Sequence, residues 1–141
     1  MWSPGQCGMG RDCMTDRDHA LNMVKLARRD LKALHGMLDS DVFAEEIFGF
    51  HAQQTVEKAL KALIASRGTE YPLTHNLVAL FQLLQDHGDS LTEYRVLADL
   101  SVFAVRFRYE GGSMDQAVLD RKETIADIER LLCYVQNCLQ P

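Results

Sequence analysis

The sequence contains little that would staple a fold, export a chain or hold it in a membrane. Its 141 residues include four cysteines, which form no C-x-x-C pair and no Cys/His cluster with zinc spacing. No apolar run approaches the roughly 18 to 20 residues that a bilayer span requires. The N-terminus also lacks the charged, apolar and small-residue regions of a signal peptide. These absences predict a reduced, cytoplasmic protein that does not enter a membrane.

Several motifs that carry catalytic chemistry are also missing. The sequence has no glycine-rich phosphate loop after a strand, no G-x-S-x-G and no H-E-x-x-H. It also lacks E-x-x-H, the pairing that aims ligands inward in di-iron bundles. We therefore expect no metal and no cofactor.

Positive charge is not in excess either. The formal net charge is −5 at pH 7, which argues against a protein whose whole surface binds nucleic acid. Any contact with RNA would have to be confined to one face. Lys25, Arg28, Arg29 and Lys32 form one basic stripe that could receive phosphate or an acidic partner, although a solvated helix face is the commoner explanation.

The chain has the size of one domain. Residues 1–14 carry three glycines, a proline and no periodicity, so we expect a flexible N-terminal tail before a domain at 15–141. No alternating strand pattern appears. Apolar residues recur at helical spacing instead, and the expected helix starts and ends fall at Thr15–Leu38, Asp41–Arg67, Thr74–Gly88, Ser90–Tyr109 and Ser113–Leu139. The fold class expected is all-α, an up-and-down bundle of about five helices.

The segment from Phe43 to Arg67 is expected to be the central helix, against which the other helices pack. One broad side is apolar, whereas His51, Gln54, Lys58 and Lys61 fall together on the other side. This pattern predicts a buried central helix with one polar stripe.

The sequence around that stripe resembles the characteristic motif of a known protein family. The stretch F-H-A-Q-Q-x-x-E-K-x-L-K-A-L from Phe50 to Leu63 is similar to the characteristic helix of HEPN domains. As in that family, Gly68, Pro72, Thr74-His75-x-Leu77 and Arg106-Phe107-Arg108-Tyr109 follow. The resemblance implies a small all-helical, usually dimeric domain, often encoded beside a minimal nucleotidyltransferase. Some members are ribonuclease toxins, and others have no recognisable catalytic motif.

This sequence departs from the ribonuclease members. They use an arginine followed after four to six residues by a histidine, which serves as acid or base. The corresponding positions after Arg106 and Arg108 hold Gly111 to Asp115, and the last histidine of the chain is His87. The motif is absent, so we do not expect inherited ribonuclease activity.

Two sets of residues remain as a candidate binding site. His51, Gln54 and Lys58 form a line along the central helix, and Arg106, Arg108 and Tyr109 bring two cations and a stackable ring beside a glycine turn. Arginine suits phosphate because its planar fork donates two parallel hydrogen bonds. The alternative is structural: internal hydrogen bonds of His51 and Gln54, and pairing of Arg106 with Asp99 or Glu110.

The sequence therefore predicts a non-catalytic HEPN binding module. It would work with a minimal nucleotidyltransferase supplied in trans, binding nucleotide or RNA or presenting substrate, as in a toxin–antitoxin pair. The alternatives are a ribonuclease that recruits His51 or His75, and a purely structural interaction domain. We also expect a homodimer, with Phe43, Ile47 and Phe50 at the interface, because they extend the apolar arc of the central helix.

Overall fold

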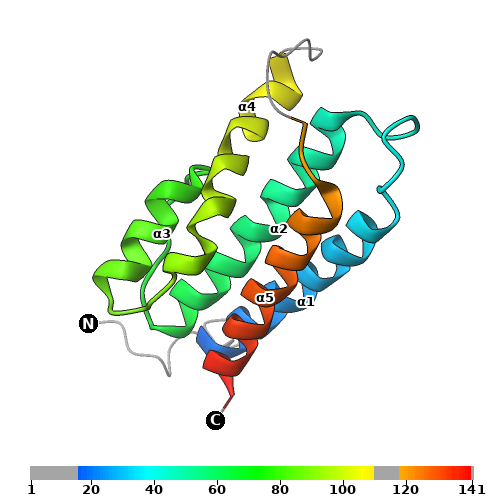
Figure 1. The fold of residues 1–141 in the computed structure, drawn as a ribbon. Helices are drawn as coiled ribbons and strands as arrows, with labels where there is room; N and C mark the ends of the chain where they lie inside the picture. Colours follow the sequence, from blue (N-terminus) through cyan, green and yellow to red (C-terminus); the bar gives the residue numbers. More distant parts are fainter. Residues whose placement is uncertain (1–15, 110–117, 141) are drawn as a thin grey trace, which may run out of the picture.

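The computed structural model describes residues 16–109 and 118–140, and within these ranges the protein is helical without a strand. Six elements follow one another: α1 (Asp16–His35), α2 (Glu45–Ser66), α3 (Leu77–Asp86), the 3₁₀ helix η2 (Thr92–Ser101), α4 (Val102–Tyr109) and α5 (Arg121–Leu139). The predicted all-α bundle of about five helices is confirmed (Figure 1). Residues 1–15 and 110–117 lie outside the described part, and with them the predicted tail.

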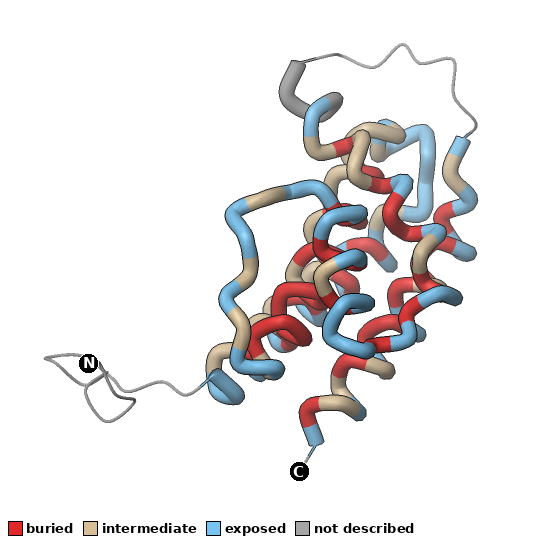
Figure 2. Tube along the Cα trace, turned by 90° about the vertical axis from the view of Figure 1, so that its left-hand side faces the viewer, coloured by how far each residue is buried: buried red, intermediate tan, exposed pale blue. Residues whose placement is uncertain are grey.

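Helix α2 is the centre of the bundle, as the sequence pattern indicates. It contacts each of the other described elements, and Figure 1 shows α1 and α5 on one side of it and α3 and α4 on the other. Fourteen of its 22 residues are buried, whereas α1 buries only one stripe, from Ala20 to Leu34 (Figure 2). Side chains attached to α2 are therefore fixed by packing on several sides.

The connection between α1 and α2 is longer than the sequence pattern suggests. Helix α1 ends at His35, so the predicted seam residue Leu38 lies in the connection and is exposed. Asp41 was expected to cap the second helix, but its backbone N–H donates to the Asp39 carboxylate in a separate turn, and α2 begins only at Glu45. Short polar side chains that favour caps favour such turns equally.

A glycine follows the end of α2, and an asparagine caps the start of α3. Gly68 comes just after α2 with a φ of 73°, the left-handed conformation for which a glycine after a helix was expected. Helix α3 begins after Asn76, whose side chain accepts from the Val78 N–H at 3.0 Å. Thr74, the predicted cap, instead accepts from the Asn76 N–H. The predicted start was therefore two residues early.

The predicted fourth helix is not one α-helix. Ser90 and Leu91 precede the helical part, Thr92–Ser101 form η2, and only the last eight residues form α4. The large buried side chains recur at every third position, at Leu91, Tyr94, Leu97, Leu100 and Phe103. A 3₁₀ helix has three residues per turn, so this spacing aligns them on one line. The expected single α-helix, with most of its surface buried, is therefore wrong over residues 92–101.

Ser113, the predicted start of the fifth helix, lies outside the described residues, and α5 begins at Arg121. Asp120 caps it by accepting from the Glu123 N–H at 3.0 Å. Val118, expected in its apolar seam, precedes the helix and is 76% exposed. The rest of the predicted seam, from Ile125 to Leu139, is buried.

Candidate functional site

The polar stripe of α2 divides into an outer and an inner part. His51, Gln54 and Lys58 are half-buried along one line of the helix. Lys61, expected to share that outer face, is instead buried with 8% of its surface exposed. It is one of four side chains in a polar network at the heart of the bundle.

That network is centred on the buried carboxylate of Glu57. Lys61 Nζ donates to it at 2.8 Å, Gln53 Nε2 at 2.8 Å, and His75 Nδ1 lies 3.0 Å away. Gln53 also donates to the His75 backbone carbonyl. Two motif pieces that are far apart in the sequence, on α2 and before α3, therefore meet in one cluster.

The Glu57 carboxylate stays ionised more readily than an ordinary one. Burial by itself would raise its pKa, but hydrogen bonds from Lys61, Gln53 and His75 outweigh this effect and hold the pKa below the usual 4.5. A buried carboxylate with several donors is the arrangement that favours the charged form. The network is therefore an ion pair with satisfied partners rather than an isolated buried charge.

His75 connects this network to solvent. Its Nδ1 contacts Glu57, while 57% of its side chain is exposed. In the described part of the protein, Nε2 has no partner. A buried carboxylate at one ring nitrogen fixes the orientation of the imidazole and leaves the other nitrogen available to a ligand.

The network continues toward α1 through an aromatic contact. Lys61 Nζ lies 5.3 Å from the centre of the Tyr71 ring, and the Tyr71 hydroxyl is 2.9 Å from His19 Nε2. The His19 and Tyr71 rings are stacked. The segment between α2 and α3 is thereby attached both to the core and to α1.

Gln54 and Lys58, in the outer part of the stripe, each contact one polar side chain. Gln54 Nε2 donates to Gln53 at 2.8 Å, which leaves its amide oxygen available. Lys58 pairs with Asp30 of α1, so its charge is largely neutralised. Sequence reasoning named both residues but did not anticipate Asp30 as a partner, because that pairing depends on how α1 crosses α2.

Arg106, Arg108 and Tyr109 lie in the last turns of α4, and their side chains are outside the described part. Their backbone can still be placed, because α4 runs antiparallel to α2 (Figure 1) and Phe103 packs on Gly49. At 1.5 Å per helical residue, Arg106 is displaced along the bundle by about 7 Å from His51 and about 18 Å from Lys58. Of the α2 set, His51 is therefore the residue nearest in level to the arginines.

A second polar cluster was not anticipated. Asp89 is buried and accepts hydrogen bonds from Arg67 and, at 3.1 Å, from the Tyr134 hydroxyl. Burial, with hydrogen bonds involving Cys138 and Asp89, raises the pKa of Tyr134. The cluster joins the end of α2 to α5, and its three side chains have partners, so we regard it as structural.

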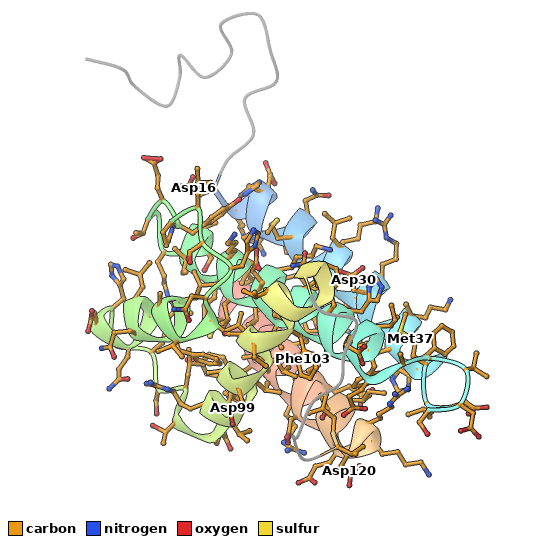
Figure 3. The ribbon with its side chains drawn as sticks, turned by 90° about the horizontal axis from the view of Figure 1, so that it is seen from above. Asp16, Asp30, Met37, Asp99, Phe103 and Asp120 are labelled. Atoms are coloured by element: carbon orange, nitrogen blue, oxygen red, sulfur yellow. The ribbon has the colours of Figure 1, made fainter. Side chains whose placement is uncertain are left out.

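A cavity of about 510 Å³ lies between η2, α4 and α5. Asp99, Phe103 and Asp120, three of its lining residues, are labelled in Figure 3. None of the residues that line it belongs to the predicted site. Over residues 16–109 and 118–140, no group of three His, Cys, Asp or Glu side chains could hold a metal ion.

Comparison with known families agrees with the arrangement of the motifs. The model of the HEPN domain matches residues 20–138. The chain belongs to the HEPN family. No curated protein and no solved structure matches it significantly.

The HEPN match extends over the whole central network and over the helix that carries Arg106 and Arg108. It therefore includes both halves of the candidate site. No described helix of this HEPN domain is long and apolar enough to cross a membrane.

Proposed function

We propose that this HEPN domain is a non-catalytic binding module for a nucleotide or RNA. The observation that carries the proposal is the orientation of His75 by the buried carboxylate of Glu57, on the helix that also bears half-buried His51 and Gln54. A ligand would meet hydrogen-bonding groups that are already fixed, so binding would cost little ordering of side chains.

Affinity for phosphate requires positive charge that is not already paired. Lys58 is engaged with Asp30, so the proposal assigns this role to Arg106 and Arg108, with Tyr109 stacking on a base. His51 is nearest to them in level and would contact the same ligand. The missing histidine after these arginines leaves a site that binds without cleaving.

Binding of a fluorescent ATP analogue and of a labelled single-stranded RNA tests this role. Arg106→Ala or Arg108→Ala is expected to weaken binding by about 1.5 to 3 kcal/mol, the scale of a charge-assisted hydrogen bond. Arg95→Ala on η2 is the matched control, since it also removes one cation. Equal affinity of all three variants and the wild type would contradict the proposal.

The proposal includes two protein partners. The first is a minimal nucleotidyltransferase in trans, as in a toxin–antitoxin pair, because this chain has no nucleotidyltransferase motif of its own. Copurification with the product of the neighbouring reading frame, and transfer of a nucleotide to Tyr109 or to a bound substrate, would support it. If a well-folded Arg106→Ala variant bound the partner as tightly as the wild type, Arg106 would not contribute to this interface.

The second partner is another copy of the chain. Phe43, expected on the central helix, lies in the connection just before α2, whereas Ile47 and Phe50 lie on α2. All three are half-buried, which fits an apolar patch shared by two protomers. Sedimentation at micromolar concentration is expected to show a dimer that Ile47→Glu dissociates. A wild-type monomer would contradict this expectation.

Ribonuclease activity is the second candidate function, and one observation favours it. A histidine held at Nδ1 by a buried carboxylate resembles a general base oriented for proton transfer. Cleavage of structured RNA by the pure protein, abolished by His75→Ala and by Glu57→Gln, would establish it. We expect no cleavage, because the four-to-six-residue arginine–histidine spacing is absent.

A further inference from the structure

The outward face of α1 is almost purely cationic. Between positions 22 and 33 its exposed residues are Asn22, Lys25, Arg28, Arg29, Lys32 and Ala33. With about 100° between successive residues, the four cations fall within an arc of about 100°. They cover two successive turns, so this face, called here the α1 basic face, presents four positive charges over about 10 Å of helix.

Little on the protein neutralises the α1 basic face. In residues 16–109 and 118–140, Lys25, Arg29 and Lys32 have no hydrogen-bond or ion-pair partner, and Arg28 donates only to the neutral amide of Gln136. Two nearby carboxylates are engaged elsewhere. Asp30 lies off this arc, paired with Lys58, and Glu129 contacts His35 at the end of the helix.

The concentration of cations contrasts with the rest of the molecule. The chain carries a net charge of −5, yet its α1 basic face holds four of the 15 lysines and arginines on two turns. Side chains of one sign repel each other in the absence of a counter-charge. An anionic ligand along the helix would remove this repulsion.

The chemistry of this face favours a phosphodiester chain over a protein or a bilayer. Interfaces with proteins centre on buried apolar or aromatic anchors, and helices that lie on membranes need an apolar side. The exposed large hydrophobic residues of this region are Leu21 and Leu38, at the two limits, and none lies between them on α1. Charges without apolar anchors suit a repeating phosphate backbone.

We propose that the α1 basic face binds the backbone of single-stranded RNA, without reading its sequence. This inference rests on the proposed function for the class of ligand, but it uses a different helix from the site proposed above. That site, called here the α2 site, combines His51 and Gln54 of α2 with Arg106 and Arg108 of α4. RNA would contact Lys25, Arg28, Arg29 and Lys32 through successive phosphates, and binding would depend on salt. The α1 basic face would hold the strand while the α2 site selects the nucleotide.

Salt dependence gives the expected result its magnitude. Each phosphate contact of a single strand contributes about −0.7 to the slope of log K against log salt, so four contacts predict about −2.8. Between about 50 and 200 mM salt, the affinity for a labelled uridine 12-mer should therefore fall roughly 50-fold. In the double variant Arg29→Gln/Lys32→Gln the slope should become shallower, at about −1.4. Binding should also be more than tenfold weaker at about 50 mM salt.

The control variant is Arg95→Gln/Arg130→Gln, which changes the net charge equally at η2 and α5. It should retain the wild-type slope and affinity. Equal behaviour of the two double variants, or no binding by the wild type at low salt, overturns the inference. So does a polyglutamate peptide that binds as tightly as RNA, since the face would then belong to an acidic protein.

The same measurement separates this inference from the proposed function. If only the α2 site exists, Arg106→Ala weakens the ATP analogue while the two α1 substitutions leave the RNA slope unchanged. If only the α1 basic face exists, the α1 substitutions make the salt slope of RNA binding shallower, and Arg106→Ala changes the affinity for neither the ATP analogue nor the RNA.

Discussion

The ring of Phe103 occupies the space where Gly49 lacks a side chain. A Cβ atom at Gly49 would lie within 2.6 Å of three carbons of that ring, and both residues are buried. Only glycine lets α4 approach α2 this closely. The contact fixes the level at which α4, with Arg106 and Arg108, passes α2.

We expect Gly49→Ala to destabilise the fold by about 1 to 3 kcal/mol, the usual cost of overpacking a core contact. Urea unfolding measures the change. The double variant with Phe103→Leu should recover part of the loss, because the smaller side chain vacates the space. Additive effects of the two substitutions would show that they do not share this contact.

Lys61 and Lys58 provide a matched pair on one helix. Lys61→Met leaves the carboxylate of Glu57 buried without its cation, so we expect a loss of about 3 to 5 kcal/mol in unfolding free energy. Lys58→Met breaks a pair whose side chains keep solvent contact and should cost only about 0 to 1 kcal/mol. Similar losses for the two variants would contradict the distinction between an inner and an outer stripe.

The lowered pKa of Glu57 predicts the direction of an acid effect. Its stabilising contribution should be complete above the usual value of 4.5 and lost as the pH falls through its lower folded pKa. Thermal unfolding of the wild type and of Glu57→Gln between pH 6 and about pH 3 measures this. The advantage of the wild type should shrink on acidification, whereas a constant difference would exclude the linkage.

Arg121 holds the connection between α1 and α2 in place by hydrogen bonds to its backbone carbonyls. Its buried guanidinium donates at 2.7 Å to the carbonyls of Met37 and Phe43 and lies 5.0 Å from the Phe48 ring. Arg121→Met should cost about 2 to 4 kcal/mol, since two carbonyls lose their donors. Faster hydrogen exchange over residues 36–44 would locate the loss.

Arg130→Met is the control for that measurement. Arg130 is exposed and pairs with Asp127 on its own helix, so its loss should cost about 0 to 1 kcal/mol. If the two substitutions were equally mild, Arg121 would not be holding the connection.

Local pattern predicted the helices but not how they meet. The seam of α1 from Ala20 to Leu34, the central position of α2 and the glycine stop at Gly68 follow from short-range periodicity and backbone sterics, and all three are observed. Asn76 caps α3 in place of the expected Thr74, because several short polar residues near one boundary can each accept a backbone N–H. Pattern alone does not rank them.

The same limit applies to the candidate site. His51, Gln54 and Lys58 could be placed on one face from their spacing, but the burial of Lys61 depends on the segment from Tyr71 to His75, which crosses over it. The charge of Lys61 favoured an exposed position. The HEPN motif includes both the α2 stretch and Thr74-His75, and the contact of His75 with buried Glu57 explains why these two pieces occur together.

The threefold period of η2 has a consequence for changes in chain length. Residues of a 3₁₀ helix advance by about 120° and 2 Å each, so deletion of three residues between Thr92 and Ser101 would return the buried line to the same direction, about 6 Å shorter. Deletion of one residue would rotate everything after it by about 120° and turn Phe103 away from Gly49. Natural variation in length is therefore expected to occur here in steps of three.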